Sequence, residues 1–329
     1  MTLYNLNHNF INTRQIFICG CSRSGTTMLG SILGSAPGCV VTPESQFKQT
    51  IPDAFCADWN RGIYRADFLE ALKNNFRFKL WDINVPKIDL PKMLKSEDYR
   101  RALLSLVDHY ARVQEKNPWN VWVDHTPENA RDHSKLLVIF PEAQFIHIVR
   151  DPRAVAASIL PLAWGPFSAR KAALFWKQRI SYGQALERLC PDKCIRIYYE
   201  DIVTSPVKTI KYVCDFCRIK YDDNILTGSG FRIPTYTKKQ HRLIGSKPDP
   251  SRINSWQESL DVWQIAEIEE IVGDMMDLMG YKKFVTGKFS ERPLMKKFAQ
   301  KAIPFTSFLK SKKYRIKKKL YGRLNRFIK

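Results

Sequence analysis

Residues 16–27 read IFICGCSRSGTT, and this stretch decides the fold. It begins with an apolar run rich in β-forming side chains that ends at Gly20. A short loop with a second glycine, Gly25, follows, and a helix-like segment opens on Thr26 and Thr27. A strand, a glycine-containing loop and a helix in this order present backbone N–H groups and a helix N-terminus to an anion. The stretch therefore predicts a phosphate-binding loop.

This loop departs from the nucleotide triphosphatase pattern GxxxxGK[ST], in which a lysine follows the second glycine. Thr26 stands at that position, and the basic residue is Arg23, inside the loop. The positive charge therefore meets a different part of a phosphate chain, which argues against an ordinary kinase or ATPase. Because such a loop alone is also compatible with a plain turn between a strand and a helix, a second anion site is needed to support the prediction.

A second segment supplies that site. Residues 145–149, FIHIV, are typical of a buried strand, and Arg150 follows directly. The next residues, DPRAVAASIL, are helix-like and contain Ser158. Taken alone, Arg-Asp-Pro after a strand is commonly the start of a helix with proline in its first turn. The presence of both segments in this order makes a chance match to a site for two anions much less plausible.

Together these motifs resemble the donor site of the sulfotransferases, which use 3′-phosphoadenosine-5′-phosphosulfate (PAPS). CSRSGTT resembles the family's 5′-phosphosulfate loop, and Arg150 with Ser158 resembles its 3′-phosphate site. Residues 195–201, 247–256 and 265–281 resemble the strand ending in YED, the closing segment and the last helix, so the similarity covers residues 14–284. In style the motifs are closest to the tyrosylprotein and bacterial carbohydrate sulfotransferases. The resemblance implies that the donor is bound by Arg23, Ser24, Gly25, Thr26, Thr27, Arg150, Ser158 and Arg252.

Three residues are predicted to be catalytic. Arg23 would stabilise negative charge on the departing phosphate, because its planar guanidinium donates several hydrogen bonds at once. Glu44 is the first candidate for the base that deprotonates the acceptor, since it stands where tyrosylprotein sulfotransferases carry their catalytic glutamate; the alternative is that it only caps the next helix. His125, in DHTP where many relatives have KTP, is the second candidate base. It could also replace a sulfate-contacting cation or be an ordinary loop histidine.

The order of elements predicts an α/β fold with a P-loop-like central parallel sheet and helices on both faces, because β-loop-α units repeat along the chain. Ligands bind beyond the carboxyl ends of the strands in such sheets. We therefore expect the residues that follow strand ends to converge on one crevice. Residues 46–118, predicted to be mostly helical, and the loop at 227–256 are expected to shape the acceptor site. The residues expected in the crevice are Arg23, Glu44, Asp124, Arg150 and Glu200.

The positive charge is concentrated at the C-terminal end of the chain. The 329 residues carry a net charge of +21, but those from 282 onward hold 17 lysines and arginines against one acid, Glu291. We therefore predict a sulfotransferase domain at 1–285 and a basic amphipathic tail at 286–329. The tail suits an anionic membrane surface; packing on the domain is an alternative, and nucleic-acid binding is the least favoured one. Without a visible signal peptide or membrane span, we expect a cytoplasmic protein, peripheral at the membrane.

These observations predict an enzyme that moves a sulfuryl group from PAPS to an acceptor hydroxyl on a glycan, a glycolipid or another molecule. A tyrosine side chain is the alternative acceptor. A P-loop nucleotide kinase is the alternative from a different class. Neither a metal nor a further cofactor is expected, because no cluster of metal-ligating residues is apparent in the sequence.

Overall fold

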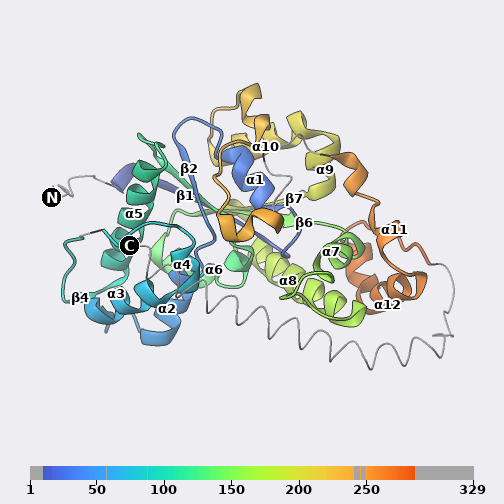
Figure 1. Ribbon diagram of the computed structural model, residues 1–329, viewed down its shortest axis with the longest axis horizontal. Helices are drawn as coiled ribbons and strands as arrows, with labels where there is room; N and C mark the ends of the chain where they lie inside the picture. The colour runs from blue at the N-terminus through green and yellow to red at the C-terminus, as the bar shows by residue number, and fades with distance from the viewer. Residues whose placement is uncertain (1–9, 57, 87, 241–244, 246–248, 286–329) are drawn as a thin grey trace.

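The computed structural model describes residues 10–56, 58–86, 88–240, 245 and 249–285 (Figure 1). The predicted tail, and Lys247 of the predicted closing segment, lie outside these residues. A five-stranded parallel sheet with the order β2-β5-β1-β6-β7 forms the centre. Its strands are β1 (Arg14–Gly20), β2 (Cys39–Thr42), β5 (Val121–Asp124), β6 (Gln144–Val149) and β7 (Cys194–Tyr198).

Both faces of this sheet are buried, which explains why its strands are continuous apolar runs rather than alternating ones. Successive side chains of β1 point to opposite faces. Phe17 belongs to an apolar core that includes Trp122 and Phe140. Ile16 and Ile18 belong to a second core on the other side. The sheet therefore sits between two layers, as the sequence predicted.

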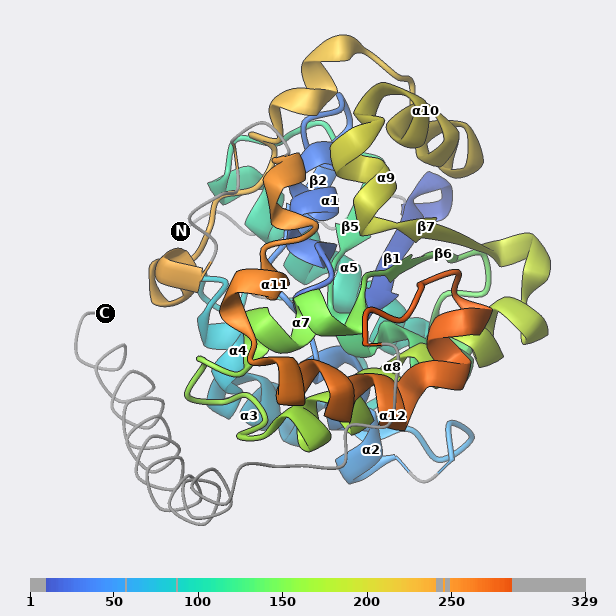
Figure 2. The ribbon, with the colours of Figure 1, turned by 90° about the vertical axis from the view of Figure 1, so that its right-hand side faces the viewer.

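Helices from different parts of the chain cover the two faces. One is covered by α1 (Thr26–Leu33), α9 (Tyr199–Thr204) and α10 (Pro206–Cys217), the other by α6 (His133–Ile139) and α8 (Ala169–Leu189) (Figure 1). A third core joins α7 (Pro152–Ile159) and α8 to α11 (Trp256–Ser259) and α12 (Val262–Leu278), which lie beside them in Figure 2.

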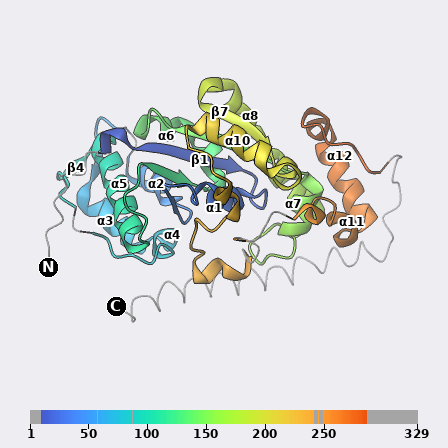
Figure 3. The same ribbon diagram turned by 90° about the horizontal axis from the view of Figure 1, so that it is seen from above.

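The segment between β2 and β5 forms a separate group at one end of the sheet, opposite α7, α11 and α12 (Figure 3). It is mostly helical, as predicted, but also contains a two-stranded antiparallel pair. Phe47, Phe68 and Tyr99 bury its helices against the same core as Phe17. Its elements are α2 (Phe47–Phe55), β3 (Ile63–Tyr64), α3 (Arg65–Asn74), α4 (Phe76–Lys79), β4 (Met93–Leu94) and α5 (Ser96–Val113).

The chain between β5 and β6 contains two short helical elements rather than one continuous helix. Residues 128–140 form a 3-10 turn, η2 (Pro127–Ala130), followed by the shorter α6. Asn129 explains the break, because its side-chain amide donates to the carbonyl of Ile18 at 3.0 Å and holds the turn against the end of β1. Among the helices of the described residues, none combines the length and apolarity needed to span a bilayer.

Candidate active site

A cavity of about 780 Å³ lies at the carboxyl ends of the parallel strands. Its wall includes every predicted site residue except Ser24. The predicted convergence holds for Arg23, Glu44 and Arg150 but is wrong for Asp124 and Glu200, which are used elsewhere in the fold. The predicted residues in the wall are Arg23, Gly25, Thr26, Thr27, Glu44, His125, Arg150, Ser158 and Arg252.

The phosphate-binding loop has the backbone that an anion site requires. Gly25 precedes α1 with φ of 98°, a left-handed conformation that side chains with a Cβ rarely adopt. A Cβ at this position would also stand 2.8 Å from a ring carbon of Tyr199. Arg23 is itself left-handed, with φ of 76°. The loop therefore curls so that Thr26 and Thr27, at the start of α1, face the cavity.

Ser24 contributes differently from the prediction. Its side chain is fully buried, and its Oγ has no hydrogen-bond partner within the described residues. Its backbone N–H donates to the carbonyl of Cys21 at 3.1 Å, which closes the turn of the loop. Ser24 therefore shapes the loop in this structure, and its contact with a donor stays a prediction.

Arg23 and Arg150 bring two positive charges to one side of the cavity. The Arg23 Nε donates to Ser158 Oγ at 3.1 Å, so the loop and the second predicted anion site touch directly. Arg150 donates to the carbonyls of Arg23 at 2.9 Å and Arg252 at 3.2 Å. Its guanidinium stacks on the ring of Tyr199, 3.9 Å from the ring centre. This stack orients Arg150 where β6 ends.

The electrostatics of this pair indicate an anion site. Burial lowers the pKa of Arg23, and the positive charge of Arg150 lowers it further. Arg150 is buried and Arg23 is half-buried, and an anionic ligand would stabilise two cations placed this close together. The buried Arg150 Nε also has no hydrogen-bond partner in the described part of the chain. These residues therefore fit a ligand with two separate anionic groups, as PAPS has.

Glu44 also lines the cavity, and its carboxylate has a basic and an amide side chain beside it. Arg77 NH1 is 3.0 Å from its Oε2, and Gln46 Nε2 donates to the same oxygen at 2.9 Å. Gln46 also approaches Glu128 Oε2 at 3.4 Å, and Arg179 lies 3.6 Å from the other oxygen of Glu128. This half of the cavity therefore carries two carboxylates with cations close by.

His125 lines the cavity as a neutral side chain. Burial lowers its pKa, although the charges of Glu44 and Asp124 oppose this. Because the usual pKa of histidine is already about 6.5, His125 is uncharged at neutral pH. Its Nδ1 lies 3.5 Å from Thr27 Oγ1, and its buried Nε2 has no hydrogen-bond partner among the residues described. A neutral imidazole can accept a proton or a hydrogen bond, whereas the lysine of a KTP motif carries a positive charge.

Asp124 is part of a buried network rather than of the cavity wall. Its carboxylate is 3.0 Å from Lys48 Nζ, and both side chains are fully buried. It also accepts hydrogen bonds from Ser45 Oγ and from the amide of Asn129. Burial alone would raise the pKa of Asp124, but the charge of Lys48 and these hydrogen bonds lower it to about 2.

This network fixes the two candidate bases relative to each other. Ser45, next to Glu44, donates its backbone N–H to Thr126 Oγ1 at 2.9 Å. Thr126 follows His125, and its own N–H donates to Asp124 at 3.0 Å. The loops after β2 and β5 are thus joined by buried hydrogen bonds, which are expensive to break.

Glu200 also has a structural position. It accepts from the N–H of Asp151 at 3.0 Å and from the hydroxyl of Tyr281 at 3.0 Å. Burial raises its pKa. These contacts tie the start of α9 to the start of α7 and to the chain after α12. Glu200 therefore supports the loop of Arg150 from behind.

The wall also contains residues that were not singled out from the sequence, among them Tyr199, Arg77 and Glu128. The position of Tyr199 directly after β7 was a usable signal, since it belongs to the YED segment. Arg77 lies in the insertion and Glu128 in a turn, and neither has a local pattern that marks it. Within the described ranges, no group of three or more His, Cys, Asp or Glu side chains is placed to hold a metal ion.

Comparison with known proteins agrees with this geometry. The family model described as "Sulfotransferase family" matches residues 15–223, which include both anion-site motifs. The chain belongs to the sulfotransferase family. The sulfotransferase domain of the Synechococcus PCC 7002 olefin synthase has a similar fold, with a TM-score of 0.52 at 20% identity, covering 82% of this chain and 96% of that domain. The central sheet is therefore the P-loop-like sheet of the family's fold.

Two kinds of sulfotransferase are among the curated relatives. Protein-tyrosine sulfotransferase 1 of Danio rerio is 26% identical over 68% of this chain and 59% of its own length. Carbohydrate sulfotransferase 2 of Mus musculus is 23% identical over 43% of this chain and 35% of its own length. The chain thus spans only part of these relatives, and they differ from each other in the acceptor that their names state.

Proposed function

We propose that this sulfotransferase transfers a sulfuryl group from PAPS to an acceptor hydroxyl of a glycan or glycolipid. The observation that carries the proposal is the pair of arginines, half-buried Arg23 and buried Arg150, that face one cavity from the ends of two neighbouring strands. PAPS supplies a sulfuryl group already joined to a phosphate leaving group. Arg23, Thr26, Thr27 and the N–H groups of the loop would hold the 5′ end, while Arg150 and Ser158 would hold the 3′-phosphate.

The chain's own groups perform the remaining chemistry. As the acceptor oxygen forms its bond to sulfur, the bond from sulfur to the phosphate oxygen breaks and negative charge grows there. Arg23 offsets this charge at close range. Glu44 accepts the proton of the acceptor hydroxyl. His125, being neutral, is the alternative proton acceptor.

The charge of the cavity supports a neutral acceptor. Near Glu44 each carboxylate already has an arginine beside it, Arg77 at Glu44 and Arg179 at Glu128. These pairs offer an acidic peptide no net positive charge, whereas sugar hydroxyls can donate hydrogen bonds to both carboxylates. The similarity to protein-tyrosine sulfotransferases keeps tyrosine as the second candidate acceptor. Cytoplasmic location and peripheral membrane binding stay predictions, since the tail that would provide the latter lies outside the described residues.

Calorimetric titration with 3′-phosphoadenosine-5′-phosphate, with ATP as the control, tests the donor assignment. We expect tight binding of the former and weak binding of ATP, because only the former carries the 3′-phosphate that Arg150 would meet. Preference for ATP would refute the assignment and favour a nucleotide kinase. Sulfation of an alkyl glycoside, compared with an acidic tyrosine peptide, then tests the acceptor.

A further inference from the structure

The short helix α4, in the insertion between β2 and β5, is held firmly in place. The side chain of Asn75 caps it by accepting the backbone N–H groups of Arg77 at 2.9 Å and Phe78 at 3.3 Å. Phe78 is buried, and its ring packs edge-on against Phe47 with the ring centres 5.6 Å apart. Phe47 opens α2, three residues after Glu44. The helix is therefore anchored to α2, which begins three residues after the candidate base.

Phe76 and Arg77, the two residues before Phe78, contact residues of the cavity wall. Phe76 packs edge-on against Tyr236, with ring centres 5.1 Å apart. Tyr236 belongs to the turn at 235–240, which lies beside α4 in Figures 1 and 2 and lines the cavity. Arg77 reaches Glu44 at 3.0 Å. The helix α4 therefore contacts both the candidate base and the part of the cavity wall that the segment after α10 forms.

The ion pair of Arg77 and Glu44 is too exposed to contribute much to stability. The Arg77 side chain is 36% exposed and that of Glu44 21%, and such pairs contribute on the order of 0–1 kcal/mol. Its effect is on orientation instead. Arg77 and Gln46 both approach Oε2 of Glu44, from two different elements. Two donors on one oxygen fix the plane of the carboxylate and so the direction of its other oxygen.

We propose that Arg77 is a positioning residue that orients Glu44 toward the acceptor hydroxyl, and that α4 ties this orientation to the turn at 235–240. The proposal rests on the role of Glu44 as the base. It gives the insertion a part in the reaction besides shaping the acceptor site. A one-ångström displacement of a reacting group is costly in rate, so a residue that does not touch the substrate can still govern turnover.

A double-mutant cycle of Arg77→Met and Glu44→Gln tests this role. Formation of 3′-phosphoadenosine-5′-phosphate from PAPS is measured with octyl β-glucoside as the acceptor and, in a second series, with water as the only acceptor. Arg77→Met alone should lower kcat about tenfold, a part of the roughly 10²–10⁴-fold contribution of a general base. In the Glu44→Gln background the same change should alter kcat less than about twofold, because effects acting through one group are not additive.

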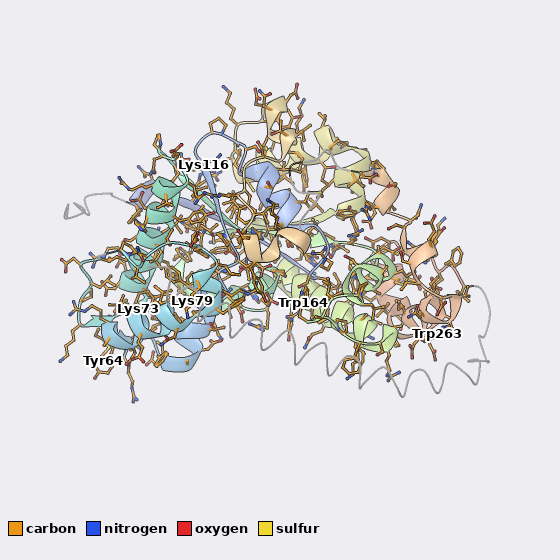
Figure 4. All side chains as sticks on the ribbon, in the orientation of Figure 1. Tyr64, Lys73, Lys79, Lys116, Trp164 and Trp263 are labelled. Carbon is orange, nitrogen blue, oxygen red and sulfur yellow. The ribbon has the colours of Figure 1, made fainter. Side chains whose placement is uncertain are left out.

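Two further variants sharpen the test. Arg77→Lys should recover part of the lost kcat, because it keeps the charge but not the planar fork. Lys73→Met is the matched control; Lys73, labelled with Lys79 in Figure 4, is exposed on α3 and carries the same charge. It should leave kcat unchanged, and affinity for 3′-phosphoadenosine-5′-phosphate should be the same in all the Arg77 and Lys73 variants.

The outcomes separate this inference from the function it rests on. If Arg77→Met lowers kcat by the same factor with and without Glu44, Arg77 acts independently and the inference is refuted while the base assignment stands. If Glu44→Gln alone leaves kcat unchanged, the base assignment fails and the positioning role fails with it. Weaker donor binding in Arg77→Met would likewise overturn the inference, because it would place Arg77 in the donor site.

Discussion

Replacing Lys48 by methionine should destabilise the fold by about 3–5 kcal/mol at pH 7, the usual loss when one partner of a buried ion pair is removed. Lys48 and Asp124 are both fully buried, and Lys48 also donates to Asn129 at 2.8 Å. Without Lys48, the carboxylate of Asp124 stays buried with no compensating cation. Unfolding in urea, followed by tryptophan fluorescence, measures the loss as a shift of the midpoint.

The loss of stability in Lys48→Met should depend on pH, because the charge of Asp124 causes it. In the folded protein the pKa of Asp124 is about 2, against about 3.9 in an unfolded chain. Because the folded value is the lower one, this group contributes about 2–3 kcal/mol above pH 4, and the contribution is lost as the pH falls toward 2. In Lys48→Met, no cation compensates the burial of Asp124, so burial raises the pKa of this carboxyl group. Protonation of Asp124 as the pH falls then removes the buried negative charge. The destabilisation should therefore shrink between pH 7 and pH 5.

A second variant controls for simple loss of packing. In Lys48→Met with Asp124→Asn, both charges are removed and most of the shape is kept, so we expect most of the stability to return. The reasoning would be refuted by a loss below about 1 kcal/mol for the single variant at pH 7. A loss that is the same at pH 7 and pH 5 would refute it as well, because it would show that the charge of Asp124 is not the cause.

The remaining predictions concern the donor, the base and the tail. Arg150→Ala should weaken 3′-phosphoadenosine-5′-phosphate binding about 10- to 100-fold, the range for a lost hydrogen bond to a charged group, and should hardly change binding of adenosine phosphosulfate without the 3′-phosphate; equal losses for both ligands by calorimetry would contradict the assignment. Glu44→Gln should lower kcat about 10²–10⁴-fold and leave donor affinity intact; full activity would move the role of base to His125 or elsewhere. Truncation after Gly287 should abolish co-sedimentation with anionic vesicles, since it removes a tail whose basic residues contribute about 1 kcal/mol each near such a surface; retained binding would exclude the tail as the anchor.

The donor side of the site was accessible from the sequence because its determinants are local. A strand that ends in glycine, a loop and a helix start lie within twelve residues, and their geometry is set by backbone preferences such as the left-handed conformation of Gly25. The position of Arg150 at the end of β6 follows from the same local pattern. Parallel strands then bring such ends to one edge of the sheet, so the meeting of Arg23 and Arg150 could be predicted.

The acceptor side was not accessible in the same way. Asp124 and Glu200 follow strand ends as Arg150 does, yet they are taken up by partners that come from distant parts of the chain. Lys48 neutralises Asp124, and Tyr281 binds Glu200. A pattern that places a residue at the edge of a sheet cannot say whether a distant side chain has already bound it.

By itself, the sequence determined the parallel α/β fold, the strand, loop and helix of residues 16–27 and the positions of Arg23 and Arg150 after neighbouring strands, because short-range backbone and hydrophobic preferences specify all three. Only the tertiary structure decided that His125 is neutral and that Arg77 pairs with Glu44. Burial depends on what packs against a group, and ion pairs join residues that only the complete fold brings together. For the same reason the structure, not the pattern of residues, separates the side chains that face the acceptor from those that hold the fold.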